Sequence, residues 1–214
     1  MISFALIIIY IIFIFCISLV FKKLNPSNKE LLRKIIHIGI GPIIPLAIFL
    51  GISQTYAITF AGVITFLILL NYIYKLFPII EDVDRRSLGT LFYCLSLLTL
   101  IIIFWDKNPS ALIAGFFIMS FGDGFAGLIG KSFKSKEWII LNQKKSLIGT
   151  LTMFLISLIV VTLLGIYYGY GLHFQYLIVA LIATFLEQIS IFGIDNLIVP
   201  LSSSIIYSLL IPNL

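Results

Sequence analysis

Long apolar runs recur along this 214-residue chain and constrain its fold more than any other feature. Runs of about 18 or more residues can cross a hydrocarbon core of about 30 Å as helices. Only 11% of the residues are charged, whereas soluble domains carry roughly 25%. Because lipid offers no partner to backbone N–H and C=O groups, each run must be helical. The sequence therefore predicts an all-α, polytopic helical membrane protein of about seven to eight transmembrane helices, forming one domain over residues 1–214.

Eight runs are candidate spans. They cover residues 2–21, 35–52, 55–74, 88–105, 109–130, 147–168, 174–192 and 197–213. The first run has no basic segment before it and is too long for the apolar part of a secretory signal, so we expect a retained span.

The connecting segments predict how the spans are oriented. With the N-terminus outside, four segments face the cytoplasm: 22–34, 75–87, 131–146 and 193–196. Together they hold every Lys and Arg of the chain except Lys107. This bias follows the positive-inside rule and favours an even number of spans.

The net charge of +5 does not indicate a nucleic-acid partner. The basic residues sit in short segments between apolar runs, so no basic face is left once the spans are removed. Cys16 and Cys94 lie inside apolar runs and match no metal or redox spacing, which favours core residues. The expected surroundings of the chain are the lipid bilayer.

Asp123 is the polar residue that most needs an explanation, because it falls inside a predicted span. An ionisable group at mid-membrane costs at least about 2.5–3.5 kcal/mol and is a functional hypothesis by default. Four nearby glycines let a backbone or a ligand approach closely: Gly122, Gly124, Gly127 and Gly130. The alternative is small-residue helix packing with an Asp cap. Since packing does not require an acid, we favour function.

The segment from Lys144 to Thr150, Lys-Lys-Ser-Leu-Ile-Gly-Thr, opens the sixth span. Its lysines, its hydroxyl and the free N–H groups of a helix start form a good anion site. An N-cap with lysines that reach the membrane interface is an equal alternative. With Asp123 nearby, a phosphate together with a divalent cation becomes the better interpretation.

Further polar residues fall in or near spans. Glu187 lies in the seventh span, and Asp195 and Asn196 follow it. Glu187 and Asn196 could face one cavity if the helix breaks near Gly193, and carboxylates there could hold magnesium or accept a proton from an alcohol. The alternative for Glu187 is a buried acid paired with a lysine or an arginine.

Arg33, Lys34 and His37 open the second span, with Arg33 and His37 on one helix face. Arg33 and Lys34 alone are interpreted as ordinary topology signals. For His37, one turn inside the span, a functional role and a simple hydrogen-bonded histidine are equally good interpretations. The charged run from Glu81 to Arg86 is interpreted as a solvated loop, and His173 as uninvolved.

Three ordered motifs resemble the polyprenol kinase family, which includes dolichol kinase and phytol kinase. They are Gly122-Asp-Gly-Phe-Ala-x-x-x-Gly130, Lys145-Ser-Leu-Ile-Gly-Thr150, and Glu187 followed by Asp195-Asn196 and Pro200. Arg33-Lys34-x-x-His37 also looks like the family's N-terminal signature. The resemblance covers about residues 33–201.

The resemblance implies a CTP-dependent kinase that phosphorylates an isoprenoid alcohol, phytol or a related prenol, at the cytoplasmic face. Phosphoryl transfer needs mainly positioning and charge neutralisation, so we expect Asp123 and Asp195 to bind Mg²⁺ with the nucleotide. Glu187 would orient or deprotonate the alcohol. The expected nucleotide- and phosphate-binding residues are Gly122, Gly124, Gly130, Lys131, Lys144, Lys145, Ser146, Gly149 and Thr150. Further possible site residues, with no role assigned, are Arg33, Lys34, His37 and Asn196.

One position departs from the family's pattern. Ile148 stands where the family usually has Glu, which bears on the choice of nucleotide. The short chain looks more like phytol or farnesol kinases, so the expected location is a bacterial plasma membrane or a thylakoid-type membrane.

Two other functions were considered. A phosphatidate cytidylyltransferase would also use CTP and lipid, but its Gly-His-Gly-Gly run is absent from the sequence. A small proton- or cation-coupled transporter would place its acids near the bilayer midplane. In this chain the acids cluster towards one end of their predicted spans, which favours an enzyme at the interface.

Overall fold

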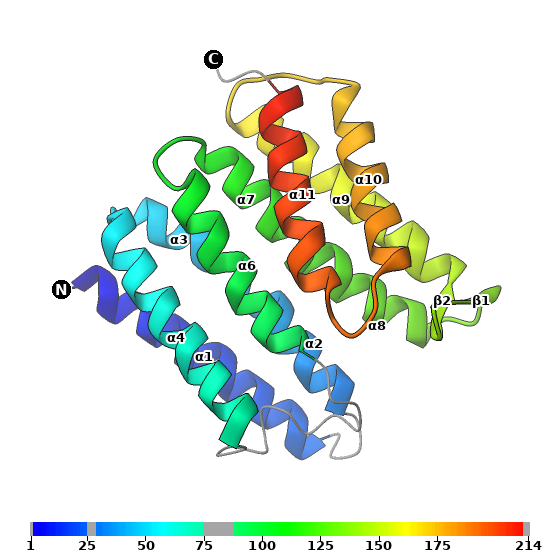
Figure 1. Ribbon diagram of the computed structural model, residues 1–214, viewed down its shortest axis with the longest axis horizontal. Coiled ribbons are helices and arrows are strands. Elements are labelled where there is room, and N and C mark those ends of the chain that lie inside the picture. Colours follow the sequence, from blue (N-terminus) through cyan, green and yellow to red (C-terminus); the bar gives the residue numbers. More distant parts are fainter. Residues whose placement is uncertain (1, 25–28, 75–87, 212–214) are drawn as a thin grey trace.

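The computed structural model describes residues 2–24, 29–74 and 88–211, which form a bundle of helices with one small hairpin (Figure 1). The elements are α1 (Ile2–Leu24), α2 (Lys29–Ile40), α3 (Ile43–Phe49), α4 (Gln54–Tyr74), α6 (Gly89–Phe104), α7 (Pro109–Phe117), η1 (Ile118–Asp123), α8 (Gly124–Ser132), β1 (Glu137–Ile140), β2 (Gln143–Ser146), α9 (Leu147–Tyr167), α10 (Gln175–Ile189) and α11 (Asp195–Leu210).

Each of the eight predicted spans is helical over most of its described residues. Among the described residues, five helical segments are long and apolar enough to cross a membrane: Ile2–Leu24, Leu31–Phe49, Gln54–Tyr74, Pro109–Ser132 and Leu147–Tyr167. Three apolar helices are shorter: Gly89–Phe104, Gln175–Ile189 and Asp195–Leu210. The prediction of an all-α polytopic membrane protein is confirmed.

The second span differs from the prediction in its start and its continuity. Helix α2 begins at Lys29, so Arg33 and Lys34 lie within a helix and not before one. The helix then breaks at Gly41 and Pro42 before α3 begins. Proline supplies no N–H to continue the helical ladder, which explains the break.

The segment expected as a plain connection at 131–146 contains an antiparallel hairpin of β1 and β2. Its two-residue turn, Leu141 and Asn142, has φ values of 48° and 63°. Two positive φ angles are the signature of a type I′ turn, whose twist matches that of paired strands. The hairpin gives Lys144 and Lys145 opposite orientations, because successive strand residues point to opposite faces.

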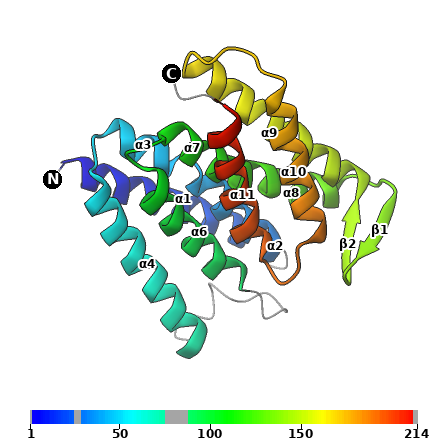
Figure 2. The ribbon, with the colours of Figure 1, turned by 45° about the horizontal axis from the view of Figure 1, so that its top comes forward.

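The centre of the bundle is the long segment α7–η1–α8. Within α7, Ala111, Leu112 and Ala114 are fully buried. Helix α11 crosses α7 closely at Gly115, where a Cβ atom would lie 2.3 Å from the Pro200 carbonyl oxygen. Helices α1 and α4 lie at the periphery, and α4 leans away from the rest of the bundle (Figure 2).

Alternation of the helices brings five segments to one end of the bundle. These segments are α2, η1, the β2–α9 junction, the end of α10 and the start of α11, and contacts link α2 to η1 and α8, and α10 to α9 and α11. Most of the polar residues singled out in the sequence lie on them. The fold therefore gathers these residues at a single place.

Candidate active site

Asp123 is held by two residues of α2. The Lys34 Nζ atom lies 2.6 Å from Asp123 Oδ2, and it also donates to the Asp123 backbone carbonyl at 3.1 Å. His37 Nε2 lies 3.3 Å from the same carboxylate oxygen and 3.0 Å from the Met119 carbonyl oxygen. All three side chains are buried. The carboxylate therefore has an ammonium partner inside the bundle, which lowers the cost of burying its charge.

Local geometry explains why Asp123 and α2 meet. Asp123 ends η1, a π-helical turn of a kind that is frequent at functional sites. Beyond it, Gly127 lies under the Lys34 side chain, where an added Cβ would be 2.7 Å from Lys34 Cε. Gly124 likewise faces Ile38, because an added Cβ would lie 2.4 Å from Ile38 Cγ1. These glycines allow α2 to approach α8, so the packing interpretation holds for them alongside a buried acid.

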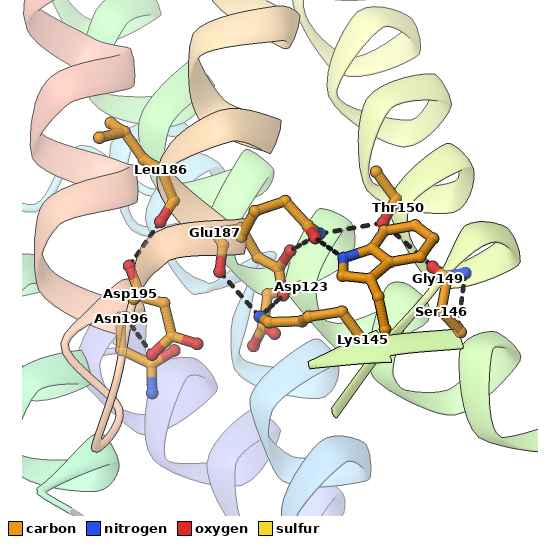
Figure 3. A network of polar contacts seen from close by, with 12 residues as sticks. Asp123, Lys145, Ser146, Gly149, Thr150, Leu186, Glu187, Asp195 and Asn196 are labelled. Atoms are coloured by element: carbon orange, nitrogen blue, oxygen red, sulfur yellow. Dashed lines mark hydrogen bonds and ion pairs between the residues drawn. The ribbon is translucent and has the colours of Figure 1, made fainter. Parts of the chain in front are cut away.

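A second ion pair, largely but not fully buried, joins the hairpin to α10. Lys145 of β2 donates to a carboxylate oxygen of Glu187 and, at 2.8 Å, to the Glu187 backbone carbonyl. The other carboxylate oxygen accepts from Gln188 Nε2 at 2.7 Å. Figure 3 shows Lys145 reaching across from the strand to Glu187. The alternative interpretation of Glu187, an acid paired with a lysine, describes this contact correctly.

Gln188 was missed in the sequence and links the parts of this network. Its Nε2 donates to Thr150 Oγ1 at 2.9 Å, and its Oε1 accepts from Trp138 Nε1 at 3.3 Å. It thereby ties α10 to the start of α9 and to β1. An uncharged amide inside an apolar span next to an acid is a signal that could have identified it.

The N–H groups at the start of α9 already have partners. Leu147 donates to the Lys136 carbonyl at 2.9 Å, Ile148 to Ser135 Oγ at 3.3 Å, and Gly149 to the capping Ser146 Oγ at 3.2 Å. The expected phosphate site relied on these donors. A phosphate there would have to use side chains such as Lys145, or replace one of these bonds.

Other predicted phosphate-binding residues differ in their surroundings. Lys144 is exposed and pairs with Glu137 at 2.7 Å, on the opposite face of β2 from Lys145. Lys131 is exposed in the last turn of α8. Gly130 packs against α9, since an added Cβ would lie 3.0 Å from Gly149 Cα. Gly122 packs against Met153, since an added Cβ would lie 2.8 Å from the Met153 sulfur. Their roles in binding nucleotide stay predictions.

Asp195 and Asn196 begin α11 after a break at Phe192 and Gly193, which have φ values of 54° and 84°. The helix therefore breaks near Gly193, as the sequence hypothesis required, but of Glu187 and Asn196 only Asn196 lines the apolar cavity described below. The Asp195 carboxylate accepts from the Asn196 N–H at 3.0 Å and lies within electrostatic range of both buried ion pairs. Among the described residues it makes no ion pair.

The donor set suits a cation that arrives with a nucleotide. Within the described ranges no three His, Cys, Asp or Glu side chains gather as a metal site. Mg²⁺, however, is commonly held by one or two carboxylates together with substrate phosphates. Asp195, which has no ammonium partner among the described residues, and the neighbouring Asp123 supply such a pair.

Arg33, His173 and the charged run at 81–86 differ in how they relate to the site. Arg33 lies within electrostatic range of Asp123 and His37. His173 lies outside the cluster, with its Nε2 2.6 Å from the Tyr170 carbonyl oxygen. The charged run at 81–86 falls outside the described residues.

Comparison with known proteins places the chain among kinases of isoprenoid alcohols. It is 37% identical to the phytol kinase of Synechocystis sp. over 86% of this chain and 81% of that protein. It is 31% identical to a probable chloroplastic phytol kinase of Triticum aestivum, over 87% of this chain and 69% of that protein. With the chloroplastic farnesol kinase of Arabidopsis thaliana the identity is 26%, over 83% and 64%.

No family model and no solved structure matches the chain. The similarity to the Synechocystis enzyme nevertheless extends over most of both proteins. The chain belongs to the polyprenol kinase family, in the group of the phytol kinases.

Proposed function

We propose that the protein catalyses CTP-dependent phosphorylation of an isoprenoid alcohol, phytol or a related prenol, as a single membrane domain over residues 1–214. The observation that carries this proposal is the cluster of two buried ion pairs with Asp195 beside them. Charged groups are expensive inside an apolar bundle and mark functional sites. The names of the relatives supply the class of substrate.

The carboxylates on the two sides of the cluster have different roles in this proposal. Asp123 and Asp195 hold a Mg²⁺–nucleotide complex, and the ion neutralises charge on the phosphates when bound. Lys34 keeps Asp123 ionised and oriented through its 2.6 Å contact. Lys145, supported by Lys131 and Lys144, attracts the phosphate oxygens. Since Lys145 bridges to Glu187, it also links the nucleotide side to the alcohol side.

Glu187 accepts the proton of the alcohol. As the substrate oxygen bonds to the terminal phosphorus of CTP, the bond from that phosphorus to the CDP oxygen breaks, and the hydroxyl proton passes to the Glu187 carboxylate. Hydrogen bonds from Lys145 and Gln188 hold this carboxylate in place. Such positioned proton transfer contributes about 10²–10⁴-fold to rates.

The proposed active site faces the cytoplasm, or the equivalent side of a thylakoid-type membrane. The basic segments that follow the positive-inside rule support this orientation, because β2 and the start of α2 belong to them. Plasma membrane and thylakoid-type membrane are both consistent with cyanobacterial and chloroplastic relatives.

The test is a phosphate-transfer assay on protein purified in detergent. Terminally labelled CTP, ATP, GTP and UTP are supplied in turn with phytol, and the lipid phosphate is separated and counted. We expect transfer from CTP that requires Mg²⁺ and disappears with EDTA. Asp123→Ala should abolish it, whereas the control Gly62→Ala, which has open space around its added Cβ, should not. Wild-type rates in Asp123→Ala would overturn the assignment.

A further inference from the structure

An apolar cavity of about 420 Å³ lies between the peripheral helices and the core, lined by residues of α1, α2, α3, α4 and α6. Its volume falls within the range of small-molecule sites, about 300–1,000 Å³. Its walls are helix faces: Ile7, Ile11 and Phe15 on α1, and Ala57, Ala61 and Ile64 on α4, line it at intervals of three or four residues. The cavity therefore runs along the helices.

The two ends of the cavity differ. One end reaches the charged cluster, where His37 and Asn196 line it. The other end is lined by Trp105 and by the rings of Phe4 and Tyr56, which pack edge to face with their centroids 5.3 Å apart. Along α6 the lining extends from Gly89 to Trp105, which is about 24 Å at 1.5 Å per helical residue.

Asn196 presents an unused acceptor at the charged end. The residue is 3% exposed, and its Nδ2 donates to the Gly89 carbonyl at 3.0 Å. Its Oδ1 is buried and accepts no hydrogen bond from any described residue. Buried acceptors are nearly always paired in native structures, so this atom points to a missing donor. A hydroxyl group is such a donor.

We propose that this cavity binds the isoprenoid chain of the alcohol. On binding, the substrate hydroxyl donates to Asn196 Oδ1, and it turns to the Glu187 carboxylate only when the phosphate is transferred. The proposal rests on the proposed function and adds where the chain lies. An extended chain advances about 1.2 Å per bond, on the scale of an extended polypeptide, so the roughly sixteen main-chain carbons of phytol fit within the length of the cavity. Trp105 and the Phe4–Tyr56 pair close the end that receives the tail.

The chain can enter from the side. Helix α1 packs on α2 and α3, and α4 packs on α6. Figure 2 shows α4 diverging from the bundle towards its C-terminal end. Residues of both peripheral helices, α1 and α4, line the cavity. An alcohol dissolved in the bilayer would therefore reach the site without passing through water.

A second apolar groove provides a matched comparison. It is lined by residues of α7, η1, α8 and α9, Phe121 and Leu163 among them, and has a volume of about 480 Å³. The cavity is lined in part by His37 and Asn196, whereas no residue of the charged cluster lines this groove. Because the two sites are lined by different helices, labelling can distinguish them.

The first experiment locates the chain without nucleotide. A phytol analogue with a diazirine near its tail is photolysed with the wild-type protein, and labelled peptides are identified by mass spectrometry. We expect labels on α1, α4 and α6 that unlabelled phytol removes. Labels on the α9 groove alone, or labels that phytol does not remove, would overturn the proposal. Labelling of the cavity in a protein that phosphorylates no alcohol would contradict the proposed function and leave the chain site intact.

Variants then separate the chain from the hydroxyl. Ala61→Trp fills the cavity and should lower photolabelling of the cavity helices at least tenfold. It should also raise the ratio of the KM for phytol to the KM for the shorter alcohol geraniol at least tenfold. Leu163→Trp fills the other groove and should change neither. Asn196→Ala should raise KM for the alcohol about tenfold with KM for CTP unchanged. If Ala61→Trp and Asn196→Ala both match wild type, the cavity does not hold the substrate. The CTP affinity and thermal stability of each variant report its folding.

Discussion

Replacing Lys34 by Met tests whether Asp123 owes its buried position to the ammonium group. The two charges lie 2.6 Å apart, and their side chains are 4% and 12% exposed. At an effective dielectric constant of about 20, two charges at this distance attract by about 6 kcal/mol, and desolvation of both groups offsets part of this. Removing one partner leaves the other buried without compensation, which typically costs about 3–5 kcal/mol.

The expected loss is large enough to measure in detergent. For a chain of this length, about 3–5 kcal/mol corresponds to a fall in Tm of about 6–20 °C. Lys144→Met is the matched control, because its pair with Glu137 is largely exposed, at 68% and 47%. Exposed pairs contribute about 1 kcal/mol or less, so this variant should melt within a few degrees of the wild type.

A double variant tests the mechanism of the loss. Lys34→Met combined with Asp123→Asn removes both charges, and we expect it to regain most of the lost Tm, because no buried charge is left without a partner. Phosphate transfer should not return, since the carboxylate is absent. The reasoning is refuted if Lys34→Met and Lys144→Met lower the Tm equally, or if the double variant is less stable than Lys34→Met alone.

Two further predictions follow from the site. Gly127→Ala should lower both Tm and activity, because its Cβ would lie 2.7 Å from Lys34 Cε. The control Gly62→Ala has open space around the new Cβ and should keep both. Equal melting temperatures of the two variants would contradict this packing argument. Glu187→Gln should reduce kcat by at least about 10²-fold with KM for CTP nearly unchanged, and it should lower Tm because Lys145 loses its partner. Adding Lys145→Met should restore Tm but not kcat. An undiminished chemical step in single-turnover kinetics would show that Glu187 accepts no proton.

The positions of the spans follow from the sequence because hydropathy acts along the chain. Each apolar run must satisfy its own backbone hydrogen bonds, so the run itself becomes a helix. The same local logic identified Asp123 and Glu187, since acids inside such runs are conspicuous. It did not find the hairpin at 137–146, whose positive-φ turn at Leu141 and Asn142 lacks the glycine that usually signals it.

Partners distant in the sequence were decided only by the tertiary structure. From the sequence, Lys34 is an orientation signal or a possible site residue without a role, yet it reaches Asp123, 89 residues away. Lys145 likewise reaches Glu187, 42 residues away. Periodicity places residues on a helix face but not opposite another helix. Packing made these pairs, and it also enclosed the apolar cavity beside Asn196, because a cavity exists only where several helices face one another.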